Sequence, residues 1–135
     1  MVIGEAAKLS GMTAKTIRYY EDIGLVHPNR VQSTGYRDYS NEDIHVLQFL
    51  HRSRNLGFSV KQCRVLLSLY QDRERASADV KAIAKTHLEE ISRKIDELKD
   101  MKNTLEHLVS TCQGDDRPNC PILLGLAGDK IENND

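Results

Sequence analysis

The segment from residue 80 to residue 112 constrains the fold most, because it has neither glycine nor proline and repeats its apolar residues every seven positions. With Lys81 at position a of the heptad, eight of the ten a and d positions are apolar or cysteine. This period predicts one continuous helix, roughly 50 Å long at ~1.5 Å per residue. Because a single helix cannot bury such a stripe, we expect it to pair with an antiparallel copy from a second chain. The alternative is a helix that folds back on residues 1–70.

Residues 1–70 predict a different architecture, made of short helices and one hairpin. Gly11 separates two short helices over residues 4–23 at the spacing of a helix-turn-helix motif. Thr13 suits the N-cap of the second helix, and Ile17 faces the core. In the first helix we expect three apolar residues to point inward: Ala6, Ala7 and Leu9.

A short β region is predicted over residues 25–39. Its centre, Ser33-Thr34-Gly35, is a turn signal with β-prone flanks, so we expect a small hairpin, or wing. Ser40 and Asp43 then have the spacing of a capping box at the start of a third helix. Ser59 suits the N-cap of a fourth helix, which places four residues on one face: Val60, Cys63, Leu67 and Tyr70.

These patterns divide the chain into five predicted parts. They are the winged helix-turn-helix over residues 1–70, a polar hinge over 71–79, the coiled-coil helix over 80–112, a loop and short helix over 112–127, and a flexible tail over 128–135. Pro121 suits the first turn of the short final helix. The predicted fold class is therefore mainly α, with a winged helix-turn-helix domain followed by a long dimerisation helix.

Charge is divided unevenly along the chain, whose net charge is -1. Residues 1–70 hold nine Lys and Arg against six Asp and Glu, and residues 71–135 hold ten against fourteen. An anionic partner is therefore expected to meet the N-terminal half. We read no membrane span and no charged-then-apolar leader, and so expect a cytoplasmic protein with reduced thiols. An enzyme is not expected, because the sequence has no Ser/His/Asp grouping and no Gly-rich phosphate loop.

Residues 13–21, Thr-Ala-Lys-Thr-Ile-Arg-Tyr-Tyr-Glu, have the composition of a DNA recognition helix. Such a helix needs short or polar side chains at its N-terminal turn to approach base edges, and cations and hydroxyls at its flanks to bind phosphates. The predicted wing adds a hydroxyl and a guanidinium. On composition alone, an ordinary amphipathic helix pair is an equally good interpretation. The candidate DNA contacts are Lys15, Arg18 and Tyr20 in the helix, and Tyr36 and Arg37 in the wing.

Three cysteines are present, and two of them form a candidate metal site. Cys63 lies on the apolar face of the fourth helix and is expected in the core. Cys112 and Cys120 flank a seven-residue loop, and Cys120 precedes a short helix whose N–H groups would stabilise a thiolate. Two thiolates are too few for zinc and suit a soft ion such as Cu(I). A redox pair and two unrelated thiols remain alternatives, and His107 is expected to be a solvated helix residue.

The N-terminal half resembles the winged-helix signature of the MerR family over residues 2–70. The similar motifs are Ile-Arg-Tyr-Tyr-Glu at 17–21, Gly-Leu at 24–25, Gly-Tyr-Arg at 35–37 with Tyr39, and Leu-Gly-Phe at 56–58. The resemblance implies a homodimer that binds a near-palindromic operator between promoter elements spaced too far apart, with RNA polymerase on the same promoter. It also implies that four residues bind DNA phosphates: Arg18, Tyr20, Tyr36 and Arg37. We expect Lys15 to make a fifth phosphate contact.

Residues 112–122 further resemble the metal loop of the copper-responsive subgroup of that family, the CueR and HmrR type, as do residues 77–81. In members that sense divalent ions a cysteine occupies the position of Ser77, so the serine removes a third thiolate. Two thiolates around a monovalent ion leave a charge of -1. The resemblance implies Cu(I), Ag(I) or Au(I) as inducer and places the partner's serine beside the metal, although Ser77 also suits a helix N-cap before Val80.

The implied mechanism is activation of copper-efflux promoters by distortion of DNA that is bound with or without metal. Our hypothesis is that the ligand gives the 112–120 loop one shape, so that three leucines pack against the rod and hinge. These are Leu123, Leu124 and Leu126. A thiol-redox regulator of the same family is the closest alternative, and a thiolate copper carrier would explain the cysteines but not residues 2–70.

Overall fold

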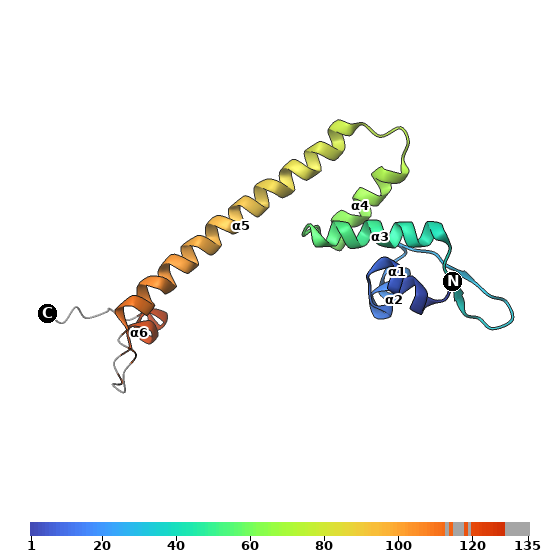
Figure 1. Ribbon diagram of the computed structural model, residues 1–135. Helices are drawn as coiled ribbons and strands as arrows, with labels where there is room; N and C mark the ends of the chain where they lie inside the picture. The colour runs from blue at the N-terminus through green and yellow to red at the C-terminus, as the bar shows by residue number, and fades with distance from the viewer. Residues whose placement is uncertain (113, 115–117, 119, 129–135) are drawn as a thin grey trace. The chain divides into compact units, whose positions relative to one another are not determined.

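The computed structural model describes residues 1–112, 114, 118 and 120–128 (Figure 1). The chain divides into two compact units, Met1–Ile83 and Ala84–Asp135. The described elements, in chain order, are α1 (Ile3–Ser10), α2 (Ala14–Asp22), β1 (Asn29–Arg30), β2 (Arg37–Asp38), α3 (Asn41–Asn55), α4 (Val60–Gln71), α5 (Ser77–Thr111) and α6 (Pro121–Ala127). The mainly α prediction is confirmed. Within the described ranges, no helix combines the length and apolar character that crossing a bilayer requires.

One hydrophobic core holds the N-terminal unit together. It lies between α1, α2, α3 and α4, and Tyr39 closes it after the wing. Ile17, Leu47 and Leu50 are fully buried, and Cys63 is 1% exposed, as expected for a core thiol. Burying one such aliphatic side chain contributes about 1.5–3 kcal/mol, so a few of these contacts fix the angle between the short helices.

Local capping sets where these helices begin. Thr13 accepts a hydrogen bond from the amide of Thr16 at 3.1 Å, which confirms it as the N-cap of α2. Ser40 forms the predicted capping box with Asp43, and Ser59 caps α4 as expected. Each cap satisfies amides that the first turn of a helix leaves without an intrahelical partner. The sequence therefore predicted the starts of α2, α3 and α4 correctly.

One predicted inward position, Leu9, is wrong, and one residue of the predicted face of α4, Tyr70, is only partly covered. Leu9 is 50% exposed, because α1 is short and its inner side is filled by Ala6 and Ser10. Tyr70 is 45% exposed and lies at the end of α4, where its hydroxyl is 2.9 Å from Nε2 of His45. In both cases the apolar pattern continued beyond the part of the helix that the core covers.

The predicted wing is present as an antiparallel hairpin of two residues per strand. Asn29 pairs with Asp38 and Arg30 with Arg37. Gly35 has a φ of 71°, a left-handed conformation that glycine adopts without strain, and this residue turns the chain between the strands. A two-stranded hairpin of this length is marginal by itself, so contacts with the helices have to hold it.

The long helix begins earlier than predicted. α5 starts at Ser77, so the linker after α4 covers residues 72–76 rather than 71–79. Ser77 therefore lies in the first turn of α5 and not at an N-cap before Val80. Residues 77–79 contain no glycine or proline, and Asp79 in the first turn suits the positive end of the helix dipole.

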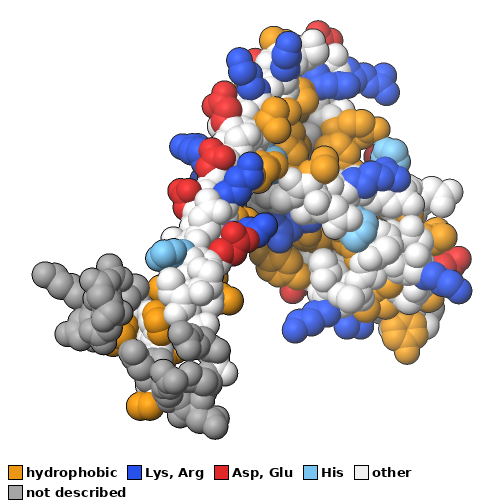
Figure 2. Space-filling model, turned by 60° about the vertical axis from the view of Figure 1, so that its left-hand side comes forward, with side chains coloured by type: hydrophobic (Ala, Val, Ile, Leu, Met, Phe, Trp, Pro, Cys, Tyr) orange, Lys and Arg blue, Asp and Glu red, His pale blue; other side chains and the backbone are white. Residues whose placement is uncertain are grey.

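An apolar stripe along α5 stays exposed in the single chain. Figure 2 shows charged side chains of both signs along the same helix. The exposed apolar residues of the stripe are Leu88, Ile95, Leu98, Met101, Leu105 and Val109. The heptad pattern therefore corresponds to a real surface.

Candidate nucleic-acid interface and thiol pair

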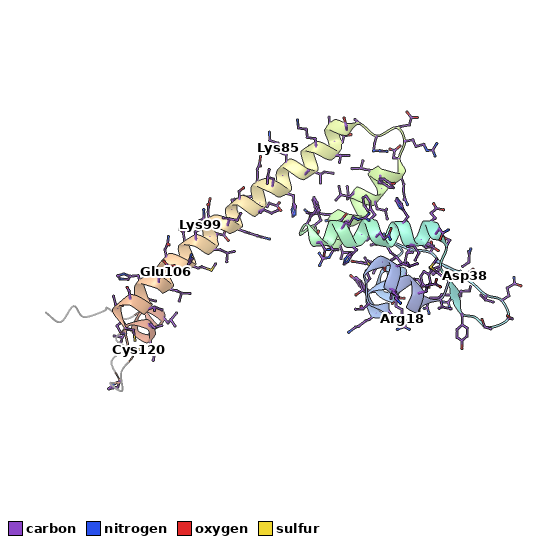
Figure 3. All side chains as sticks on the ribbon, in the orientation of Figure 1. Arg18, Asp38, Lys85, Lys99, Glu106 and Cys120 are labelled. Carbon is purple, nitrogen blue, oxygen red and sulfur yellow. The ribbon has the colours of Figure 1, made fainter. Side chains whose placement is uncertain are left out.

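The second helix, α2, presents its cations to the surface. Lys15 and Arg18 are exposed, whereas Ile17 between them is fully buried. Arg18 is labelled in Figure 3. The turn before α2 needs Gly11, whose φ of 76° ends α1 and where an added Cβ atom would lie 3.3 Å from Nε2 of His51. The helix is thus fixed by its buried side, and its polar side remains available to a ligand.

Three of the predicted DNA contacts are brought together by the fold. Arg18 from α2 and Tyr36 and Arg37 from the wing line one hollow of about 430 Å³, together with Gly35 and the first residues of the chain, Val2, Ile3 and Gly4. Tyr36 is 71% exposed. Two guanidiniums and a phenol hydroxyl around one hollow can bind phosphate oxygens.

Tyr20 occupies a different place from the one predicted. It is 4% exposed, so it is a core residue and not a surface phosphate contact. Burial raises the pKa of its hydroxyl, an effect that the nearby Arg54 guanidinium opposes. Tyr20 is three residues after Ile17 on the same helix side, which explains its inward direction. The exposed member of the tyrosine pair is Tyr19, at 48%.

A second hollow, of about 400 Å³, lies at the N-terminal turn of α2. Its lining includes Thr13, the N-cap of α2, Thr16 of α2, and His51 and Arg54 from the end of α3. Arg54 is held by a hydrogen bond from Nη1 to the carbonyl of Phe58 at 2.7 Å. Sequence reasoning missed His51 and Arg54, although their i, i+3 spacing placed them on one face of the third helix.

Glu21 is a third residue that the sequence prediction left out. Its carboxylate pairs with Nε of Arg37 and lies 3.5 Å from Nη2 of Arg30. The Glu21 side chain is 17% exposed and that of Arg37 is 29% exposed. Burial first, and then the Glu21 carboxylate, raise the pKa of the buried Tyr39 hydroxyl. Arg37, a predicted DNA contact, is therefore already paired with a carboxylate of the protein itself.

The two predicted metal ligands meet at the end of the rod. Cys112 follows the last residue of α5, and Cys120 precedes α6; both are half-buried free thiols. The Cys120 side chain makes no conventional cap hydrogen bond, yet the amide of Leu123 lowers its pKa, with smaller contributions from the Ile122 amide and the Cys112 side chain. Partial burial opposes this effect. The thiolate form of Cys120 is thus favoured relative to that of an ordinary thiol.

A close helix contact supports this arrangement. A Cβ atom added at Gly125 of α6 would lie 2.9 Å from Cδ2 of Leu108 on α5. Leu108 is 6% exposed, and Pro121 starts α6 at its first position. Figure 3 shows Cys120 beside the end of α5. The missing side chain at Gly125 lets α6 approach α5, which positions Cys120 near Cys112.

The donor set is small. Among the residues that the structure describes, no group of three or more His, Cys, Asp or Glu side chains could hold a metal ion, so His107 is not grouped with the thiols. Ser77 is the first residue of the 35-residue helix that the thiols follow, roughly 50 Å away along its axis. Among the described residues of one chain, the candidate site is a pair of sulfurs, a set that suits soft ions of low coordination number.

Family models match both parts of the chain. One described as MerR HTH family regulatory protein matches residues 1–69, and one described as MerR, DNA binding, matches residues 44–108.

Full-length relatives and solved structures are also similar. The chain is 63% identical over 127 residues to the HTH-type transcriptional regulator HmrR of Rhizobium leguminosarum bv. viciae, covering 94% of this chain and 98% of the relative. It is 41% identical over 128 residues to the HTH-type transcriptional regulator CueR of Escherichia coli O157:H7, covering 95% of each. The crystal structure of the regulator PbrR691 from Ralstonia metallidurans CH34 with lead(II) aligns with a TM-score of 0.80 at 28% identity, over 93% of this chain and 98% of that one.

Proposed function

The chain belongs to the MerR family of helix-turn-helix transcription regulators, and on that premise we propose that it is a homodimeric activator that responds to Cu(I) through Cys112 and Cys120. Ag(I) and Au(I) are proposed as substitutes. Its target would be promoter DNA shared with RNA polymerase, in the reducing cytoplasm. MerR-family transcription regulators are not enzymes.

The observation that carries this proposal is the thiol pair at the junction of α5 and α6. Both sulfurs are free and half-buried, and the pKa of Cys120 is lowered by the amide of Leu123. No third donor group accompanies them in the described part of the chain. Two thiolates fit a soft monovalent ion, whereas a divalent ion would prefer further ligands.

Ser77 supports the same choice of metal. A serine hydroxyl is a poor ligand for a soft ion, and Ser77 is far along α5 from the thiols of its own chain. We propose that the partner's serine lies beside the metal in the dimer without binding it. When bound, the ion would link the two sulfurs and neutralise one of their two negative charges.

Support for DNA binding comes from the hollow that Arg18, Tyr36 and Arg37 share. We propose these three residues as phosphate contacts, with Lys15 at the exposed start of α2 as a fourth. Tyr20 is omitted because of its burial. Its proposed task is instead to help fix Arg54, whose guanidinium lies by its hydroxyl.

Dimerisation is proposed through the exposed stripe of α5, in an antiparallel arrangement. Leu98 and Leu105 are 61% and 51% exposed in the single chain, which is costly for a helix of this length unless another helix covers them. MerR regulators bind promoter DNA as homodimers. The proposed stripe therefore agrees with the way the family assembles.

The proposed switch acts on the shape of the operator rather than on its occupancy. Leu123 and Leu126 of α6 are 65% and 72% exposed, so they are available to pack elsewhere when the loop before them takes one shape. The wing and α2 would keep their phosphate contacts in both states. A ligand can shift such an equilibrium only by its differential affinity for the two states.

The test combines a metal titration with a transcription assay under reducing conditions. The wild type is expected to bind one Cu(I) per chain and to activate transcription from its own operator. Cys112→Ser with Cys120→Ser should abolish both metal binding and activation while the affinity for operator DNA stays unchanged. Cys63→Ala is the matched control, because Cys63 is buried in the other unit and should leave Cu(I) binding intact.

Three results would overturn the proposal. Absence of Cu(I) binding, together with activation that follows oxidation of the two thiols, would favour the thiol-redox regulator, an alternative that their proximity also permits. Loss of DNA binding in the double serine variant would refute the separation of the DNA-binding and metal-binding roles. Cu(I) binding without any salt-dependent DNA affinity would point to a copper carrier.

A further inference from the structure

The hairpin of the wing contains an unfavourable pair of charges. Arg30 on β1 and Arg37 on β2 are direct cross-strand partners. Directly opposed residues of an antiparallel ribbon point to the same face with their Cβ atoms about 5 Å apart, and like charges in that position repel. Each strand has only two residues, so the few hydrogen bonds between the strands offset little of this repulsion.

One carboxylate of α2 forms an ion pair with each of the two arginines. Glu21 pairs with Nε of Arg37 through one oxygen and lies 3.5 Å from Nη2 of Arg30 through the other. The Glu21 and Arg37 side chains are 17% and 29% exposed, so solvent screens this pair less than an ordinary surface pair, whereas Arg30 is 58% exposed and its longer contact with Glu21 is screened more. The three side chains together keep a net charge of +1.

The geometry leaves the arginines able to bind a further anion. Arg37 uses Nε for Glu21, and a guanidinium carries five N–H donors in a fixed plane. Arg30 also donates from Nη1 to the carbonyl of Gly35 at 3.4 Å, which ties it to the turn before Tyr36. Arg37 and Tyr36 then line the hollow that Arg18 enters from α2.

We propose that Glu21 is a positioning residue for DNA binding: its carboxylate joins the Arg30–Arg37 pair to α2 and so fixes the wing at the distance from the recognition helix that phosphate contact needs. This inference rests on the proposed DNA-binding function. It gives an acidic residue a favourable effect on the binding of a polyanion, the opposite of what its charge alone predicts.

The test compares the effect that the proposal expects for Glu21 with the effect that its charge alone predicts. Glu21→Gln and Asp22→Asn each remove one negative charge from adjacent positions of α2, and Asp22 is exposed. By charge alone, both variants would bind DNA more tightly. We expect Asp22→Asn to bind as well as the wild type or better, and Glu21→Gln to bind about tenfold more weakly, which is about the worth of one charge-assisted hydrogen bond. The slope of log affinity against log salt should fall by about one unit in Glu21→Gln alone.

The probe is a duplex that carries the operator selected by the wild-type protein from a random-sequence DNA library. Affinity is measured over a salt series, and thermal unfolding of each variant gives the folded fraction. A role of Glu21 in stability alone would lower the unfolding temperature but leave the affinity of the folded protein and its salt slope unchanged.

A double-variant cycle tests the repulsion argument. With Arg30→Gln in place, the like-charge pair no longer exists, so adding Glu21→Gln should cost less affinity than it does in the wild type. Equal affinities for Glu21→Gln and Asp22→Asn would overturn the inference while leaving the DNA-binding function intact. Failure of the wild type to bind any duplex would instead overturn the proposed function.

Discussion

At the scale of single residues, Cys63 and Cys120 are the same amino acid in chemically different environments. The pKa of the Cys63 thiol is raised by burial, and Cys63 is 1% exposed. The pKa of Cys120 is lowered, chiefly by the amide of Leu123. Thiolate is the form that binds metal and reacts with electrophiles, so these two residues should differ in reactivity.

Alkylation of the metal-free, reduced protein by iodoacetamide checks this difference. Because the pKa of Cys120 is lowered, its thiolate persists to lower pH than that of an ordinary thiol, and its half-maximal rate should lie at a lower pH than that of an unstructured cysteine peptide alkylated alongside. Cys63 should react only after unfolding. Mass spectrometry of peptides at a series of pH values gives each rate, and Cys112→Ser should move the Cys120 midpoint upward, since the Cys112 side chain contributes to the shift. A Cys120 midpoint at or above that of the peptide contradicts the assignment.

The residue scale also shows where sequence reasoning reached its limit. Ile17, Thr13 and the Ser40–Asp43 capping box follow from helical periodicity and local hydrogen bonding, and all were predicted correctly. Tyr20 was not, because two adjacent tyrosines give no signal of which one faces inward until the core beside them is known. Glu21 was missed for a related reason, since its partners come from strands whose register the sequence did not predict.

At the scale of elements, the apolar stripe of α5 carries the dimer proposal. Leu98 is one of the d positions and is 61% exposed in the single chain. Arg93 lies on the same helix outside the a and d positions and is also exposed. A charge placed at Leu98 would have to be buried without a partner in the dimer, whereas one at Arg93 would stay in water.

Leu98→Asp is therefore expected to raise the dimer dissociation constant at least about 100-fold, measured by analytical ultracentrifugation. Arg93→Asp introduces the same side chain and should leave the dissociation constant nearly unchanged. Equal effects of the two substitutions would mean that the stripe is not the dimer contact.

At the scale of the whole molecule, the two units differ in what stabilises them. The unit Met1–Ile83 has its own core of buried side chains, and the fold of this part could be predicted from periodicity, caps and turns. In the described part of the second unit, Leu108 is the one buried apolar residue. Heptad spacing predicted the helix itself, but the close approach of α6 to Leu108 depends on tertiary packing at Gly125, which no local pattern encodes.

This difference predicts a concentration-dependent stability. If burial of the α5 stripe requires a second chain, the unfolding temperature of the C-terminal unit should rise with protein concentration by mass action. The N-terminal unit should unfold at a temperature nearly independent of concentration. Hydrogen exchange during thermal unfolding separates the two parts, and a single transition that ignores concentration in both would contradict the prediction.

The unbroken helix from Ser77 to Thr111 has a further consequence, because its first residues belong to the N-terminal unit and its last residues lead into the thiols. Each residue advances the helix by about 100°, so residue count sets a rotational phase between Ile83 and Cys112. One alanine inserted between them would turn that phase by about 100°, whereas one extra heptad would restore it to within roughly 20°. Under the proposed function, Cu(I)-dependent transcription should fail with the first insertion and survive the second, while Cu(I) affinity stays the same in both. The helix would then tolerate changes of length only in steps of about two turns.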